Sequence, residues 1–342
     1  MKHKKIIYSL VIIAVLVIAG IITGCALFLN HPVKSETKAY LYIDDDDTAD
    51  SVYHKIEANL QVSSLTGLRM LASWSGYEEH VRTGAYRLTP SENTLAIFRK
   101  LRNGNQTPVQ VTIPSVRTVG TLIRTVSRQL MTDSASIATL LNDSAYCARL
   151  GYDKYTLPAL FIPNTYEVYW NIGPEEFIKR MVKEHDRFWN GKRTEQAKAI
   201  GFTPIEIATI ASIVEEETAN KAEKPMVAGL YINRLHKDML LQADPTVKFA
   251  LQEFGLRRIL NKHLEADSPY NTYKYAGLPP GPIRIPSVDG LESVLNYSRH
   301  DYLYMCAKED FSGTHNFAKN INEHLANARR YQQALNQRKI MK

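Results

Sequence analysis

The chain has 342 residues, 44% of them hydrophobic and 23% charged, and its glycine and proline content is ordinary for a globular protein. This length allows roughly two domains of about 100–200 residues each. The formal net charge is +7, and it falls to +4 when Lys2, Lys4 and Lys5 are set aside. An excess of that size is too small to indicate nucleic acid as a partner, although it would suit an anionic polymer.

The N-terminal segment stands out by its hydropathy. Residues 6–29 carry no charge and follow a short stub that contains the three lysines. An uncharged run of this length can span a bilayer, which takes about 20 helical residues. Lysines before such a run favour a cytoplasmic N-terminus. We therefore predict a cytoplasmic stub and single-pass transmembrane anchor over residues 1–29, in the inner (cytoplasmic) membrane, with the bulk of the chain outside the cytoplasm.

Two alternatives for this segment stay open. A cleaved signal peptide would also export the chain, although its apolar core is usually only about 7–15 residues long. The sequence ITGC at residues 22–25 is similar to a bacterial lipoprotein cleavage site, which would place a lipid on Cys25. The remaining cysteines, Cys147 and Cys306, are too few for a disulfide framework, and whether they pair stays open.

The pattern that follows predicts a small α/β unit over residues 39–113. A polar linker is predicted at residues 30–38. Beyond it, apolar spacing and turn residues predict the following elements: a strand at 39–43, helices from 48 and at 65–74, a strand at 84–88, a helix at 94–101 and a strand at 109–113. We assign residues 114–342 to a larger, mixed α/β domain, so that the chain belongs to the α+β class.

In the larger domain, helix-start signals are especially clear at Thr203, which can cap a helix that begins with Pro204 and has Glu206 at the capping-box position. The other predicted elements are helices within 118–150, a loop and strand at 161–170, a helix at 175–189 ended by Asn190-Gly191, helices opened by Pro225 and by Asp244-Pro245, strands at 302–307 and 315–317, and a polar helix from about residue 320. Residues 268–287 are rich in Pro, Gly and Tyr and predict a long functional loop.

The segment SIVEEET places three consecutive glutamates at the end of the helix that Pro204 begins. At about 100° per residue, Glu216 faces the polar side and Glu215 borders it, whereas Glu217 lies beside isoleucines. We expect its two neighbours to point toward water. A carboxyl held against apolar surface has a raised pKa. Such a group can donate a proton near neutrality, as the cleavage of a glycosidic bond requires.

Other kinds of catalytic site have no support in the sequence. There is no G-x-S-x-G nucleophile elbow, no signature of a cysteine protease and no H-E-x-x-H motif. The ten histidines show no ligand spacing, so we predict neither a metal nor a cofactor.

Residues suited to binding sugars lie in two segments. LQADPT offers Gln242 and Asp244, and SPYNTYKYAGLPPG offers Tyr270, Asn271 and Tyr273. Aromatic rings stack on the apolar faces of sugars, while amides and acids bind their hydroxyls. As alternatives, Asp244 would simply cap a helix and the tyrosines would pack in the core.

Seven ordered motifs carry a resemblance to a known family: RTGAYRLTP, FIPNTYEVYW, ASIVEEETA, VAGLYINRL, LQADPTV, SPYNTYKYAGLPPGPI and GTHNFAKNINEH. The chain resembles the membrane-anchored MltG/YceG-like endolytic murein transglycosylases from its N-terminal segment to near its C-terminus, most weakly over residues 115–160. The resemblance implies a lyase that cleaves the bond from N-acetylmuramic acid to N-acetylglucosamine inside peptidoglycan strands. It implies 1,6-anhydro ends and a role in limiting the length of nascent strands.

The family's catalytic glutamate directly precedes a threonine, which implies Glu217 here. It would act as acid toward the leaving oxygen and then as base toward the muramic acid 6-hydroxyl, so no second carboxylate is needed. The resemblance also implies a LysM-like fold for residues 39–113. The matched motifs complete the predicted substrate-binding residues: Gln242, Asp244, Tyr270, Asn271, Thr272, Tyr273, His315 and Asn316.

The predicted partners are glycan strands, the membrane and cell-wall synthesis proteins. The chain departs from the family at Glu216, where lysine is more usual, and we expect no effect because that position is on the polar side. Two other functions stay open: a muramidase that uses Glu217 with a second acid such as Asp244, and a non-catalytic, tethered wall-binding or scaffold protein.

Overall fold

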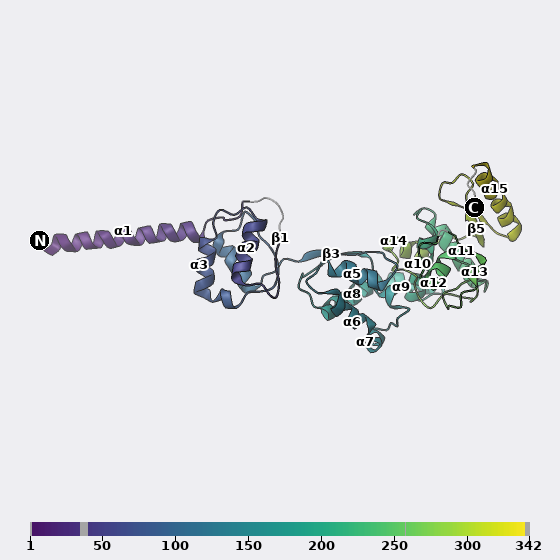
Figure 1. The fold of residues 1–342 in the computed structure, drawn as a ribbon, viewed down its shortest axis with the longest axis horizontal. Helices are drawn as coiled ribbons and strands as arrows, with labels where there is room; N and C mark the ends of the chain where they lie inside the picture. Colours follow the sequence, from purple (N-terminus) through teal and green to yellow (C-terminus); the bar gives the residue numbers. More distant parts are fainter. Residues whose placement is uncertain (1, 35–39, 257, 339–342) are drawn as a thin grey trace. The chain divides into compact units, whose positions relative to one another are not determined.

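The structure is a computed structural model that describes residues 2–34, 40–256 and 258–338 (Figure 1). It is a mixed α/β structure, as predicted, and it divides into two compact units. The first comprises Met1–Val111 and Glu167–Ile172, and the second comprises Thr112–Tyr166 and Gly173–Lys342. The segment 167–172, which the sequence analysis assigned to the larger domain, thus belongs to the first unit.

The first unit is built around one antiparallel strand pair covered by helices. In chain order it contains α1 (Lys2–Phe28), β1 (Tyr40–Ile43), α2 (Ala49–Asn59), α3 (Thr66–Ser75), the 3-10 turn η1 (Tyr77–Glu79), β2 (Gly84–Arg87) and α4 (Thr94–Asn103). Strands β1 and β2 pair with Tyr40 opposite Arg87 and Ile43 opposite Gly84. Apolar residues at alternate strand positions and along one face of each helix form its core, including Leu41, Ile43, Val52, Ile56, Ile97 and Leu101.

The predicted linker at residues 30–38 is in part wrong. The backbone N–H of Thr94 donates to the carbonyl of Asn30 at 2.9 Å, and Val33 is buried and bridges to Val62. Residues 30–34 are therefore packed into the first unit, because Val33 supplies an apolar side chain to its core. Residues 35–38 lie outside the described part of the chain.

Helix α1 exposes its apolar side chains. From Ile6 to Ile22 its large apolar residues are each more than half exposed. Within the described ranges it is the one helix that by itself is long and apolar enough to cross a membrane, over His3–Phe28.

The second unit is mainly helical. It contains α5 (Val119–Ser127), α6 (Ser134–Asn142), α7 (Ser144–Arg149), η2 (Leu157–Leu160), α8 (Pro174–Phe188), α9 (Gly191–Ile200), α10 (Pro204–Glu217), α11 (Lys224–His236), α12 (Asp244–Leu251), α13 (Asn261–Leu264), α14 (Val288–Leu295), β5 (Tyr304–Ala307), β6 (His315–Ala318) and α15 (Ile321–Gln337). Strands β3 (Val109–Ile113) and β4 (Asn164–Val168) pair, and the boundary between the two units falls within both. Strands β5 and β6 form an antiparallel hairpin with Cys306 opposite Asn316.

Helix α10 is the centre of the second core. Every residue from Ile207 to Val214 is buried, including Thr209 and Ser212, and the helix contacts α11, α12 and α14. This stretch has small or apolar residues on all sides and no charged face, so other elements of the unit can pack around it completely. Its start is as predicted: Thr203 and Glu206 form a capping box and Pro204 opens the helix.

Three helices were missed by the sequence analysis, and one of them is the four-residue α13 (Asn261–Leu264). Asn190-Gly191 was predicted to end a helix, but Asn190 accepts from the backbone N–H of Arg193 and so caps α9. Helix α14 went unpredicted, although Ser287 caps it and its apolar side packs on α10. Helix α14 is short and directly follows the Pro- and Gly-rich loop, so its helical pattern was not recognised in the sequence. The loop at 268–287 is irregular, as predicted.

Candidate active site

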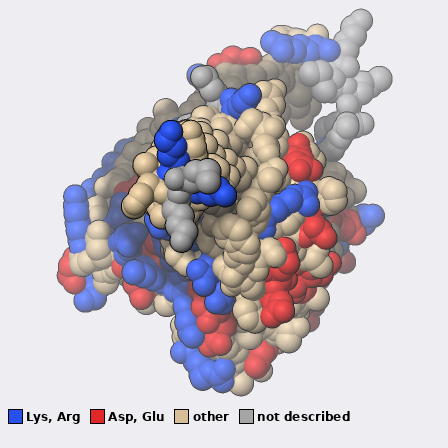
Figure 2. All heavy atoms as spheres, turned by 90° about the vertical axis from the view of Figure 1, so that its left-hand side faces the viewer, with Lys and Arg blue, Asp and Glu red and all other residues tan. Residues whose placement is uncertain are grey.

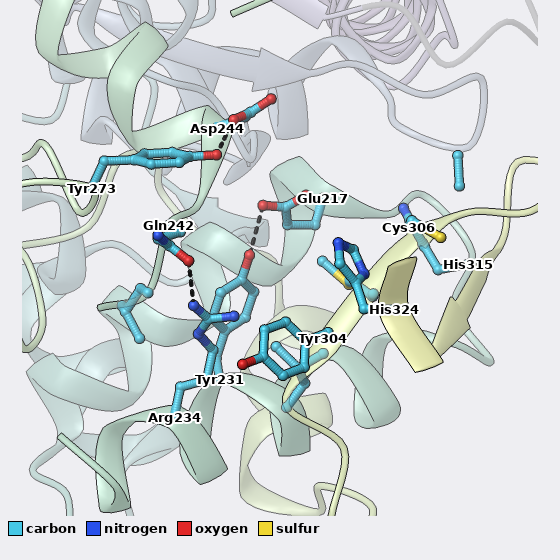
Figure 3. A pocket seen from close by; sticks show the side chains of 14 residues that line it. Glu217, Tyr231, Arg234, Gln242, Asp244, Tyr273, Tyr304, Cys306, His315 and His324 are labelled. Carbon is cyan, nitrogen blue, oxygen red and sulfur yellow. Dashed lines mark hydrogen bonds between the residues drawn. The ribbon is translucent and has the colours of Figure 1, made fainter. Parts of the chain in front are cut away.

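Glu217 lies in a cavity of about 330 Å³ in the second unit (Figure 3). The cavity lies between the C-terminal end of α10, α11 and the start of α12 on one side and the β5–β6 hairpin with α15 on the other. Its lining residues are Glu217, Leu230, Tyr231, Arg234, Leu241, Gln242, Asp244, Tyr273, Tyr304, Met305, Cys306, Ala307, His315 and His324.

Glu217 is the last residue of α10 and is half-buried, with its side chain lining the cavity. Its pKa is raised from 4.5 to about 7, chiefly by burial and with a smaller contribution from the nearby charge of Asp244. In the opposite direction, the hydroxyl of Tyr231 donates to Oε1 of Glu217 at 2.7 Å, which lowers the pKa. A carboxyl with this pKa is half protonated near neutrality. The expected desolvation of Glu217 is thus present in the structure.

Asp244 faces the same cavity and does not cap its helix. Helix α12 has Ala243 as its N-cap residue, without a side-chain cap, so the helix-capping alternative for Asp244 is wrong. Instead Oδ1 of Asp244 accepts a hydrogen bond of 2.6 Å from the hydroxyl of Tyr273. This bond and the burial of the ring raise the pKa of Tyr273, which stays a neutral hydroxyl.

Gln242 is held in the cavity by an arginine and by an unusual backbone conformation. Its φ is +51°, in the left-handed region that a residue with a side chain adopts at a cost of about 1–3 kcal/mol. Nη2 of Arg234 donates to Oε1 of Gln242 at 2.6 Å, and Nη1 donates to the carbonyl of Leu303 at 2.8 Å. Arg234 therefore links the Gln242 segment to the chain that enters the hairpin.

His315 reaches the cavity from the hairpin. Both its backbone N–H and its Nδ1 contact the buried carboxylate of Glu223, at 2.6 and 2.9 Å. Because the carboxylate fixes one ring nitrogen, the ring orientation is set. Tyr304 and His324, which stack at 5.4 Å, lie on the same side of the cavity (Figure 3).

The two glutamates before Glu217 do not point toward water, so that expectation is wrong. Their side chains are only 7% and 13% exposed, for Glu215 and Glu216 respectively. Glu215 binds Lys224 at 3.3 Å and accepts from the backbone N–H of Ser287 at 2.9 Å, at the start of α14.

Glu216 is bound by two arginines. Arg117 donates to both of its carboxylate oxygens, at 3.1 and 2.8 Å, and Nη1 of Arg284 donates at 2.9 Å. The helical wheel failed for Glu215 and Glu216 because it describes one helix alone, whereas α14 and the end of the long loop cover this side of α10.

Four of the predicted binding residues do not line the cavity. Tyr270 is buried in the core against Phe249, with ring centroids 4.6 Å apart. Asn271 is fully buried and donates to the carbonyls of Leu264 and Ala266. Asn316 donates from the opposite face of β6 to Glu309.

Thr272, the fourth, is a positioning residue in this structure. Its carbonyl accepts from the N–H of Gln242 at 3.1 Å, and its hydroxyl accepts from the N–H of Ala243 at 3.0 Å. It thereby attaches the long loop to the segment that carries Gln242 and Asp244. The predicted residues that the structure brings together are Glu217, Gln242, Asp244, Tyr273 and His315.

Sequence reasoning missed Tyr231, Arg234, Tyr304, Cys306 and His324. Tyr231 was assigned to the apolar side of its helix, which is correct, but its hydroxyl was not connected with Glu217. Tyr231 and Arg234 are three positions apart and so share a helix face, which could have indicated that the tyrosine hydroxyl lies in a polar site.

The cysteines are free thiols: Cys25 is exposed, Cys147 is buried, and Cys306 is half-buried in the cavity wall. Cys147 and Cys306 are therefore not paired. In the described part of the chain, no group of three or more His, Cys, Asp or Glu side chains is arranged to hold a metal ion.

The chain is similar to proteins named endolytic murein transglycosylase and to a solved structure of a yceG-like protein. A protein of Bacillus subtilis (strain 168) named endolytic murein transglycosylase is 28% identical over 325 residues, 89% of each chain. One of Streptococcus pneumoniae (strain D39) with the same name is 26% identical over 356 residues, and the match covers 94% of this chain but only 64% of that longer relative. A solved structure of a yceG-like protein from Listeria monocytogenes has a TM-score of 0.56 at 27% identity, covering 85% of this chain and 99% of that one.

The family profile described as YceG-like matches residues 41–330, which is most of the chain and includes every residue of the cavity. The chain belongs to the YceG-like family.

Proposed function

We propose that this protein is an endolytic murein transglycosylase, a lyase that cleaves glycan strands of peptidoglycan internally, and that Glu217 is its catalytic acid and base. The observation that carries the proposal is one carboxyl with a pKa of about 7 in a cavity lined by hydrogen-bonding and aromatic side chains. The relatives named endolytic murein transglycosylase support the reaction class.

In the first step, the protonated Glu217 donates its proton to the glycosidic oxygen as the bond from the anomeric carbon to that oxygen breaks. In the second, the Glu217 carboxylate takes the proton of the muramic acid 6-hydroxyl as its oxygen bonds to the anomeric carbon. Glu217 gives up one proton and takes one back, so no water is consumed, and the product is a 1,6-anhydro end. One carboxyl serves both steps because the nucleophile is part of the substrate. A pKa near 7 suits both roles, because it leaves neither form strongly preferred at neutral pH.

The other cavity residues would hold the sugars. Asp244 and Tyr273 present a hydroxyl–carboxylate pair, Gln242 presents an amide nitrogen, and the oriented ring of His315 leaves Nε2 for the substrate. Groups that hydrogen-bond a sugar hydroxyl discriminate against a sugar that lacks it, because they lose that hydrogen bond. Thr272 supports Gln242 and Asp244 from behind, through its hydrogen bonds to the backbone of Gln242 and Ala243.

The rest of the chain would place this site at the membrane. We propose that α1 is an uncleaved anchor with a cytoplasmic N-terminus, and that the first unit is a LysM-like, wall-binding module. The length and composition of α1 support the first point. Cell-wall synthesis proteins are proposed partners, because an endolytic enzyme tethered to the membrane meets strands as they are made.

The test is mass analysis of the products released from whole peptidoglycan by the wild type and by Glu217→Gln. Glutamine keeps the size of the side chain and can still accept from Tyr231, but it cannot transfer a proton. We expect the loss of anhydro-ended fragments by a factor of about 10²–10⁴. Asn316→Ala, which changes a polar residue outside the cavity, is the matched control. Wild-type activity in Glu217→Gln would refute the role of Glu217.

A hydrolase is the second candidate, because Asp244 faces the same cavity as Glu217. A muramidase would add water and leave reducing ends, so its products are heavier by one water molecule than anhydro products. Anhydro ends from the wild type exclude the muramidase. Binding of sacculi without any cleavage by the wild type would instead support the scaffold function.

A further inference from the structure

Trp74 is the most exposed large apolar residue in the described part of the chain, at 69%. It lies on α3, in the same unit as α1, and its ring meets that of Phe28 edge-on with centroids 5.9 Å apart. Phe28 is the last residue of α1. A tryptophan that is exposed to water and yet contacts the end of a helix of membrane length needs a physical explanation.

The position of Trp74 is fixed by close packing of α3 on α1. A Cβ atom on Gly67 would lie 2.1 Å from the carbonyl oxygen of Leu27, so glycine permits this approach. Gly67 and Trp74 are about two helical turns apart on one face of α3. Leu27 and Phe28 are half-buried, unlike most of α1. Figure 1 shows α3 beside the C-terminal end of α1.

This packing sets the level of Trp74 relative to a bilayer. The apolar run continues one residue beyond α1 to Leu29, which is 51% exposed, so the boundary between hydrocarbon and headgroups would fall near Phe28 and Leu29. Trp74 is at that level. Tryptophan is enriched at this boundary because its ring is apolar and its N–H can still bond to water or headgroups.

We propose that Trp74 is an interfacial anchor, whose indole inserts among the lipid headgroups on the outer side of the membrane that α1 spans. The inference rests on the proposed membrane anchoring by α1, and the ligand is lipid. In Figure 2, which looks toward the N-terminal end of α1, both tan surface and charged side chains surround the helix in projection. The only charged residue of α3 is Arg69, whose guanidinium lies over the ring of Tyr53 at 4.5 Å.

The consequence is a defined orientation of the first unit on the membrane. Residues 30–34 are packed into this unit and do not form a free tether. With α1 spanning the bilayer and Trp74 in the headgroup layer, two points of attachment hold the unit, so it cannot swing about a flexible joint.

The test uses the full chain in phosphatidylcholine–phosphatidylglycerol vesicles, with and without phosphatidylcholine brominated near the headgroup end of its acyl chains. Bromine quenches the fluorescence of a tryptophan that it contacts. The chain has three tryptophans. We expect bromolipid to remove about a third of the wild-type emission, and Trp74→Phe to abolish this quenchable fraction. Trp170→Phe is the matched control, because Trp170 is half-buried against Tyr42 at 4.9 Å in the same unit.

A parallel vesicle-flotation assay distinguishes failure of the Trp74 proposal from failure of membrane anchoring by α1. If the protein floats with the vesicles and Trp74→Phe is quenched as much as the wild type, the anchor role of Trp74 is overturned. If the protein does not float, the membrane anchoring by α1 fails, and this inference fails with it. The release of anhydro fragments is measured separately and does not depend on either result.

Discussion

At Glu217, burial and a hydrogen bond act against each other in setting the pKa of the carboxyl. Burial raises the pKa of Glu217 to about 7, and the hydroxyl of Tyr231 limits that rise by donating to the carboxyl. The same bond restrains the orientation of the carboxyl at the end of α10. Tyr231 is therefore a positioning residue that also tunes the acid, and the two effects can be tested separately.

Tyr231→Phe is expected to raise the pKa of Glu217 further, because the ionised carboxyl loses a donor. The alkaline limb of the pH–rate profile, measured from about pH 5 to 9, should move to higher pH, and the maximal rate should fall about tenfold as the carboxyl loses its restraint. Tyr304→Phe removes another cavity hydroxyl and should leave the limb in place. An unmoved limb in Tyr231→Phe would contradict this tuning.

The raised pKa of Glu217 also predicts how stability depends on pH. The folded-state pKa of about 7 exceeds the ordinary 4.5, so the stability linked to this proton is complete below about pH 4.5 and is lost as pH rises through about 7. The Glu217→Gln variant has no titrating carboxyl at this position, so it does not lose this stability as the pH rises. The melting temperature of the variant, relative to the wild type, should therefore be higher at about pH 8 than at about pH 5. A difference that does not change with pH would speak against a buried, titrating Glu217.

At the scale of elements, the end of α10 is fixed by ion pairs on its far side from the cavity. Arg284 binds Glu216 and also donates to Ser115, and its Nε lies 3.6 Å from Glu215. Arg284 thus joins the end of the long loop to the last turn of α10. The two glutamates before Glu217 therefore stabilise the fold, and Glu216 is held by two arginines.

Arg284→Met should destabilise the protein by about 2–3 kcal/mol, because it leaves two largely buried carboxylates with fewer partners. Arg117→Met is the control: Arg117 binds the same carboxylate but is 47% exposed, so its loss should cost about 1 kcal/mol or less. Denaturant melts at constant pH measure both. Equal costs for the two variants would show that burial does not determine the strength of this cluster.

At the scale of the whole molecule, the proposed anchor α1 determines whether the protein is bound to a membrane. A chain without residues 2–29 should remain soluble, whereas the full chain should float with vesicles, because α1 supplies the membrane-length apolar segment. Cys25→Ser and the intact mass of the membrane-extracted protein separate the alternatives. An unchanged full-length mass supports an uncleaved anchor, a shortened chain indicates a signal peptide, and a lipid lost in Cys25→Ser indicates a lipoprotein. Flotation of the truncated chain would contradict the proposal.

The sequence by itself determined the features that depend on local pattern. The capping box at Thr203, the apolar run of α1 and the order of most helices and strands follow from spacing within one segment. Glu217 was distinguished from its two neighbours by the wheel and by the family motif. Its raised pKa agrees with that choice, and its catalytic role is a proposal that the Gln variant tests.

Only the tertiary structure decided which polar side chains meet. Glu215 and Glu216 are buried because the start of α14 and the end of the loop cover them, and Tyr231 reaches Glu217 from another helix. Among the residues of the SPYNTYKYAGLPPG loop, Tyr273 enters the cavity while Asn271 supports the loop from behind. Periodicity describes one element at a time, whereas solvation and hydrogen bonding depend on every element packed around a group. The side-chain partners of Glu215, Glu216 and Glu217 lie 9 to 99 positions away along the chain.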